Sequence, residues 1–235
     1  MTRRILSSLL VLGLLTGTVL SQNLSLSNLY RPGATLVDSD GDGFTDRIEL
    51  SLIIADRPTS EEIALASEIA ARINLESLNL NFDLVRKESE IGQFSRLKNP
   101  VLIGSNLKLS QAILAQEKID LRSLSPNQGL IVVFNYQGQQ GFLLAAGSQE
   151  TLLRTGRTFF LRWPYFWEIW GRESGFTWEK MENDLEKFLI SESISVEKKI
   201  LRKALYEFPP QNNIPPSLKS LNFEAAGEIA SLTVD

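Results

Sequence analysis

The chain of 235 residues contains no cysteine and no histidine. A fold without cysteine cannot be held by disulfides, so its stability must come from packing or from a bound metal ion. The same absence excludes a Ser-His-Asp triad, a cysteine nucleophile and an ordinary zinc site. Hydrophobic residues make up 43% of the chain, which supplies enough apolar material for a large packed core.

Segments with strand periodicity alternate with segments of helical periodicity along the chain. Strands are predicted over 47–56, 77–85, 100–104 and, as a hairpin turning near Gly138, twice within 129–148. Helices are predicted over 57–74, 108–119, 149–163 and 174–191. This alternation argues for an α/β fold, with α+β as the alternative, and the hairpin favours a mixed β-sheet flanked by helices.

The helix predicted over 57–74 carries its own start signal. Thr59 and Glu62 have the spacing of a capping box, in which each side chain accepts a backbone N–H of the other residue. The apolar residues at helical spacing, which predict the buried face, are Ile63, Ala66, Ile69, Ala70 and Ile73.

The first residues have the pattern of an export signal. Arg3 and Arg4 precede an apolar run over 5–20, and Ser21 offers a cleavage point. An uncleaved membrane anchor is the alternative, but the run is shorter than the roughly 20 residues that a spanning helix needs. We therefore expect a signal peptide over 1–21, a secreted or periplasmic mature chain, and no transmembrane span once the signal is removed.

The remainder divides by composition. We expect an extended lead-in over 22–37 and an acidic loop over 38–49. An α/β domain over 47–190 and a C-terminal segment over 191–235 follow. The last segment can be the start of a further domain, because the strand-like run 227–235 has no terminal flank. Helix and strand templates fit 194–208 equally, so that stretch stays unassigned. Basic residues form no dense stripe, so no nucleic-acid partner is expected.

The acidic loop carries the most specific motif of the chain. The stretch DSDGDGFTDRIEL, over 38–50, matches the calcium-loop template D-x-[DN]-x-[DN]-G-x₅-E. Carboxylates at this spacing can turn inward around one hard cation, and Ca²⁺ prefers such oxygen ligands. The predicted ligands are Asp38, Asp40, Asp42, the carbonyl group of Phe44, Asp46 and Glu49.

This stretch resembles the DxDxDG calcium loops of exported bacterial and thrombospondin type-3-like proteins. It is only EF-hand-like, because strand alternation begins right after Asp46 where an EF-hand would have a helix. The bidentate role of Glu49 is therefore left open. The resemblance implies calcium as a structural staple and implies no enzymatic activity. A solvated acidic turn is the alternative, since Asp and Gly are favoured in turns.

All four tryptophans fall within 163–178. Their spacing can form a platform on which sugar rings stack, whereas a lid packed on the core is the alternative. The platform and its polar partners would be Trp163, Trp167, Trp170, Glu168 and Arg172. Glu168 with Glu173 can also be imagined as the acid and base of a glycosidase. A carboxylate-dependent hydrolase acting on glycans is therefore the alternative function.

The stretch 101–164 resembles the small α/β accessory domain found ahead of the catalytic barrel in several exported glycoside hydrolases. A VLIG strand and a glycine–serine turn that starts a helix carry this likeness. Those domains have no catalytic residues, so the resemblance implies an accessory role. The leading interpretation is an exported, calcium-stabilised, non-catalytic domain at the start of a larger protein, which binds carbohydrate or a downstream domain.

Overall fold

A computed structural model of the chain describes residues 23–161, 178–193, 196–212, 214–227 and 231–234. The predicted signal peptide lies outside these residues. So do Trp163, Trp167, Trp170, Glu168 and Arg172, together with Glu173. Trp178 is described, and it is almost fully buried, with its ring 6.0 Å from that of Phe159.

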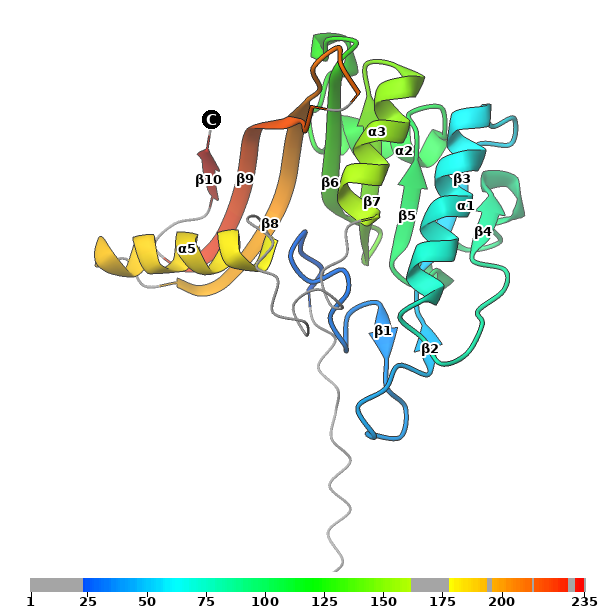
Figure 1. The fold of residues 1–235 in the computed structure, drawn as a ribbon, viewed down its shortest axis with the longest axis horizontal. Coiled ribbons are helices and arrows are strands. Elements are labelled where there is room, and N and C mark those ends of the chain that lie inside the picture. Colours follow the sequence, from blue (N-terminus) through cyan, green and yellow to red (C-terminus); the bar gives the residue numbers. More distant parts are fainter. Residues whose placement is uncertain (1–22, 162–177, 194–195, 213, 228–230, 235) are drawn as a thin grey trace, which may run out of the picture.

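The fold is built on an eight-stranded mixed sheet with the strand order β10-β9-β8-β6-β7-β5-β3-β4 (Figure 1). Neighbours among β4, β3, β5 and β7 run parallel, whereas β6, β8, β9 and β10 join by antiparallel pairing. The strands are β3 (Ser51–Ile54), β4 (Val85–Lys87), β5 (Pro100–Ile103), β6 (Gln128–Tyr136), β7 (Gln139–Ala146), β8 (Val196–Glu207), β9 (Ser217–Gly227) and β10 (Ser231–Val234). The predicted α/β fold with a mixed sheet and flanking helices is confirmed.

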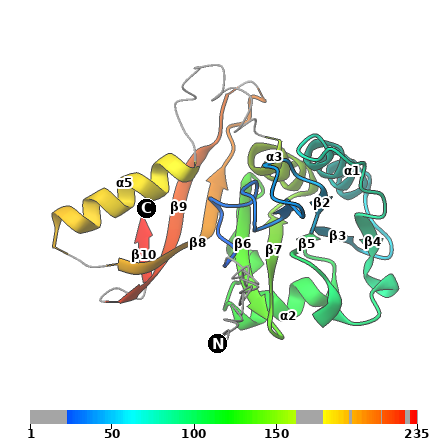
Figure 2. The same cartoon turned by 90° about the horizontal axis from the view of Figure 1, so that it is seen from below.

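Helices cover both faces of the parallel part of the sheet (Figure 2). On one face, α1 (Ser60–Asn74) and α3 (Gln149–Phe160) bury Leu65, Ile69 and Phe159 in the larger apolar core. On the other face, α2 (Lys108–Gln116) contributes Ile113 and Leu114 to a second core. The helix α5 (Trp178–Ser191) lies against β8. Short 3₁₀ turns span Glu88–Glu90, Phe94–Arg96 and Leu121–Ser123.

Helix α1 begins where its capping box predicts. The side chain of Thr59 accepts the backbone N–H of Glu62, and the carboxylate of Glu62 accepts that of Thr59. Its buried face differs from the predicted stripe at two positions: Ile63 is half exposed, and Leu65, which the stripe left out, is buried. None of the helices in the described ranges is long and apolar enough to cross a membrane.

The single strand predicted over 47–56 is wrong, because the chain divides there between two sheets. β2 (Arg47–Ile48) pairs with β1 (Leu36–Val37) in a separate two-stranded ribbon, and only β3 joins the main sheet. The side chain of Asn99 explains the break, since its amide donates to the Glu49 carbonyl group over 2.7 Å and to the Ala34 carbonyl group over 2.9 Å.

The strand predicted over 77–85 is also wrong. β4 begins only at Val85, and the residues before it form a loop in which Leu78, Leu80 and Phe82 face solvent while Leu84 is buried. By contrast, the stretch 194–208 that the sequence left open contains β8, which pairs with β6.

The lead-in before the ribbon is packed rather than peripheral: Leu24, Leu26 and Leu29 are buried in the larger core.

Candidate metal centre

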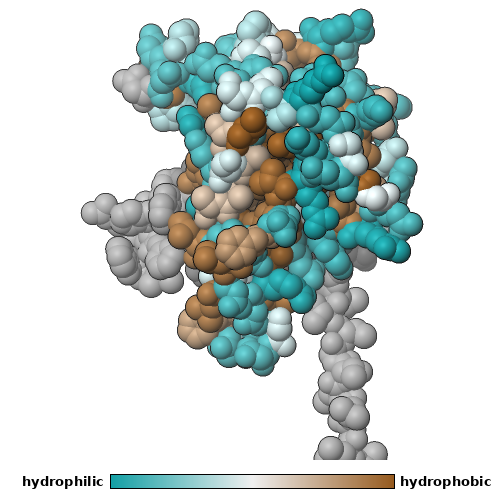
Figure 3. Space-filling view, turned by 90° about the vertical axis from the view of Figure 1, so that its right-hand side faces the viewer, coloured by the Kyte–Doolittle hydropathy of each residue, from teal (hydrophilic) through white to brown (hydrophobic). Residues whose placement is uncertain are grey.

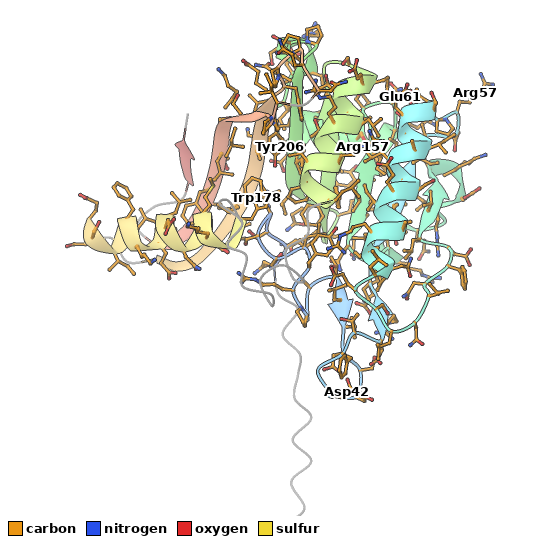
Figure 4. All side chains as sticks on the ribbon, in the orientation of Figure 1. Asp42, Arg57, Glu61, Arg157, Trp178 and Tyr206 are labelled. Carbon is orange, nitrogen blue, oxygen red and sulfur yellow. The ribbon has the colours of Figure 1, made fainter. Side chains whose placement is uncertain are left out.

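The acidic loop lies at the outer end of the two-stranded ribbon, where Asp42 is labelled in Figure 4. Pairing of Leu36 with Ile48 fixes the ribbon, and both side chains are buried in the larger core. The Asp46 N–H donates to the Val37 carbonyl group over 2.9 Å, which closes the loop. The core therefore anchors both ends of the loop while its tip stays in solvent.

Three of the predicted ligands come together at this tip. One carboxylate oxygen from each of Asp38, Asp40 and Asp42 lies within 4.8 Å of the other two. Three negative charges at this separation repel one another unless a positive charge lies among them. The cluster can therefore hold a metal ion, and its donor set of carboxylate oxygens suits a hard cation.

Backbone N–H groups of the loop hold Asp38 in place. The Gly41 N–H donates to Oδ1 over 2.7 Å, and the Gly43 N–H donates to Oδ2 over 2.9 Å. These bonds lower the pKa of Asp38 below its ordinary value, and the bond from Gly43 makes the largest contribution. Both glycines have a positive φ, of 79° and 90°, which lets the chain turn sharply around the carboxylate.

The other predicted ligands are placed differently. The Phe44 N–H donates to Oδ1 of Asp42 over 2.8 Å, and the Phe44 ring is exposed. Asp46 Oδ2 accepts the Ser39 N–H over 2.7 Å, and Glu49 forms an ion pair with Arg47 over 2.8 Å. Among the described residues, the carboxylate cluster thus contains Asp38, Asp40 and Asp42 but neither Asp46 nor Glu49.

A polar groove of about 930 Å³ lies directly beside the acidic loop. Asp38 lines one wall, so the carboxylate cluster and the groove share a residue. The other charged lining residues are Arg47, Glu49 and Lys98, and the side-chain amides come from Asn23, Asn99, Asn135, Gln139 and Gln140. Sequence reasoning missed this groove, because its residues come from five separated segments that no motif connects.

The carboxylate of Glu62, unlike those of the acidic loop, lies in the interior of the protein. Glu62 is fully buried at the start of α1, and its Oε1 has no hydrogen-bond partner within the described part of the chain. A Cβ atom built at Gly104, directly after β5, would lie 2.5 Å from this oxygen. Burial raises the pKa of Glu62 above its ordinary value despite the hydrogen bond from Thr59.

Comparison with protein-family models finds no match for the chain, and comparison with curated proteins also finds none. The two resemblances noted above therefore depend on the quoted residues alone.

Proposed function

We propose that this chain is an exported α/β domain that calcium stabilises and that has no catalysis of its own. The observation that carries the proposal is the approach of the Asp38, Asp40 and Asp42 carboxylates to within 4.8 Å on a glycine-bearing turn. Calcium accepts many oxygen ligands in a flexible geometry, whereas magnesium keeps its waters and demands a stricter octahedron. Water can complete the coordination shell at so exposed a loop.

The position of the loop explains how a bound ion would stabilise the fold. The ribbon that carries it joins the N-terminal lead-in to β3, and Leu36 and Ile48 fix it to the core. An ion held at the tip would offset the carboxylate repulsion and restrict the loop to one conformation. It binds the folded chain and not the unfolded one, so mass action favours folding.

Calcium removal tests this proposal. In a scanning calorimeter at low-millimolar calcium, EGTA should lower the melting temperature of the full chain, by an amount corresponding to about 2–3 kcal/mol if calcium is near 100 times its dissociation constant. The variant Asp42→Ala should melt at the same temperature with and without EGTA. Asp184→Ala, an exposed aspartate on α5, should keep the wild-type response. An unchanged wild-type melting curve on chelation would refute the staple.

The groove supports a binding role, and its chemistry favours carbohydrate. Side-chain amides both donate and accept hydrogen bonds, as sugar hydroxyls do, and the two acids and two bases of the lining balance in charge. Asp38 and Glu49 are already engaged with backbone N–H groups and with Arg47, which favours binding over acid–base catalysis by these groups.

Calorimetric titration with neutral oligosaccharides tests the binding role. Asn135→Ala, at the exposed end of β6, should weaken binding about tenfold if the amide contacts the sugar. Asn183→Ala on α5 provides a matched control away from the groove lining. If the heat of binding is equal for wild type and Asn135→Ala, carbohydrate is not the ligand of this groove.

A further inference from the structure

The loop between α1 and β4 has its apolar and polar sides reversed. In the run 78–82, Leu78, Leu80 and Phe82 are 68%, 73% and 80% exposed. Of the two asparagines between them, Asn81 is partly buried, and Asn79 is exposed but hydrogen-bonded to the protein. A surface segment ordinarily turns its polar side chains outward and its apolar ones inward. This reversal indicates a surface that something apolar covers.

Specific hydrogen bonds enforce the reversal. The Asn79 amide donates to the Asp46 carbonyl group over 3.1 Å. Asn81 Oδ1 accepts the Ile48 N–H over 3.2 Å, and the Asn81 N–H donates to Asn74 Oδ1 over 2.7 Å. The hydrogen bonds of Asn79 and Asn81 tie the polar side chains of this loop to the protein, and Leu78, Leu80 and Phe82 are left in solvent.

The same bonds tie this loop to the acidic loop. The Leu78 N–H donates to the Thr45 carbonyl group over 2.9 Å. Thr45 follows Phe44, whose ring is 59% exposed. We call Phe44, Leu78, Leu80 and Phe82 the apolar rim. Figure 3 views the side of the molecule formed by α1 and β4, and brown side chains interrupt its teal surface there.

We propose that the apolar rim docks on a lipid bilayer. Its side chains are aliphatic or phenyl groups without hydrogen-bonding atoms, and each protrudes with more than half of its surface in solvent. Protruding apolar side chains can enter the boundary between headgroups and acyl chains, where burial of their surface is favourable. A protein partner would instead have to supply a matching pocket for each of them.

The chain outside the described residues favours this occupant over a second copy. The apolar run 5–20 joins the fold at Asn23, and Asn23 lines the groove together with Asp38. Insertion of that run into a membrane, as a transient signal or as a retained anchor, would therefore bring the acidic-loop end of the domain toward the bilayer. The rim belongs to that end, since it includes Phe44.

Charge adds a condition to the docking. The carboxylates of Asp38, Asp40, Asp42 and Asp46 lie on the loop that carries Phe44, so they oppose approach to anionic headgroups. A cation in the cluster would offset this repulsion. The metal dependence of docking on anionic lipid rests on the proposed calcium site, whereas docking on neutral lipid does not.

A fluorophore placed on the rim tests the proposal. The chain has no native cysteine, so Leu80→Cys labelled with the environment-sensitive dye NBD reports on the rim alone. Ile190→Cys, at an exposed apolar position on α5, is the matched control. With full-length protein and phosphatidylcholine vesicles, emission at position 80 should shift to the blue and rise about twofold or more, and emission at position 190 should not. A leader inserted in the bilayer could itself bring position 80 close to the vesicle, so the decisive comparison is with rim variants that carry the same label and the same leader.

Further variants and lipids separate the outcomes. Adding Leu78→Ser and Phe82→Ser to Leu80→Cys should weaken the response to vesicles at least about tenfold. No shift at position 80, or equal shifts at both positions, would overturn the proposal. A shift without vesicles that grows with protein concentration would also overturn it, because a second copy would then cover the rim. On phosphatidylglycerol vesicles, EGTA should weaken docking. If docking is equally strong with EGTA, the proposed calcium site is refuted, whereas the proposal of membrane docking is not.

Discussion

Asp38 at the tip of the ribbon and Glu62 at the start of α1 both accept backbone N–H groups in local turns, yet their pKa values move in opposite directions. Both oxygens of Asp38 are bonded in a solvated loop, which favours the charged form. Glu62 has one bonded oxygen and one unpartnered oxygen in the core, where burial disfavours the charge. A carboxylate that accepts local backbone N–H groups is therefore favoured in its charged form in the solvated loop and disfavoured in that form in the interior.

The two regions should also differ in what stabilises them. The surroundings of α1 and β7 are held by close packing, in which Phe142 contacts Phe159 and Phe160 at centroid distances of 5.9 Å and 6.3 Å. The acidic loop, by contrast, is held by its own short-range hydrogen bonds and, in our proposal, by an ion. The variants below test this contrast.

The largest effect is expected from emptying the core. Phe142→Ala removes a fully buried ring, and we expect the free energy of unfolding in urea to fall by about 3–5 kcal/mol. The loss should be equal with calcium and with EGTA, since the ring belongs to the apolar core and not to the acidic loop. A loss that depended on calcium would show that the core and the ribbon tip are energetically coupled. The two regions would then not be stabilised independently.

A smaller effect is expected at the cap of α1. Thr59→Ala removes the side-chain acceptor for the Glu62 N–H, and we expect a loss of about 1 kcal/mol in the same urea assay, independent of calcium. Ser67→Ala, at an exposed position in the middle of α1, should cause no loss. Equal behaviour of the two variants would mean that the cap contributes nothing to stability.

The smallest effect concerns pH. Because the pKa of Glu62 is raised in the folded chain, its favourable contribution is present below the ordinary value of 4.5 and is lost as pH rises through the folded pKa. Glu62→Gln should therefore gain stability over wild type as pH rises above 4.5. Urea unfolding at several pH values, with EGTA present, measures this difference.

Neighbouring Glu61, labelled in Figure 4, provides the opposite control. A hydrogen bond from its own backbone N–H lowers its pKa, so its contribution is present above 4.5 and is lost as pH falls through the folded pKa. Glu61→Gln should therefore lose stability where Glu62→Gln gains it. If both variants changed in the same direction, burial would not be the cause of the Glu62 shift.

Local signals predicted much of this fold. The capping box placed the start of α1, the glycine turn placed the hairpin of β6 and β7, and the DxDxDG spacing placed three carboxylates around one point. Each of these features is decided within about a dozen residues of chain, so neighbouring residues suffice to specify it.

Other features needed contacts between distant segments. Alternation in 77–85 predicts a strand, but Asn79 and Asn81 are hydrogen-bonded to the chain at and just before β2 and to the end of α1. Leu78, Leu80 and Phe82 face solvent instead. Likewise the strand predicted from 47 divides at Glu49, because Asn99 takes its carbonyl group. Periodicity shows that a segment has two sides but does not show which side meets the protein.

Composition and short-range spacing are enough to specify the α/β class, the absence of cysteine and histidine chemistry, and the acidic turn. Three further features follow only from the packing of the folded chain: Glu62 is buried with an unpartnered oxygen, the groove adjoins Asp38, and Leu78, Leu80 and Phe82 face solvent. Burial and adjacency depend on which distant segments fold against one another, and no local pattern encodes that.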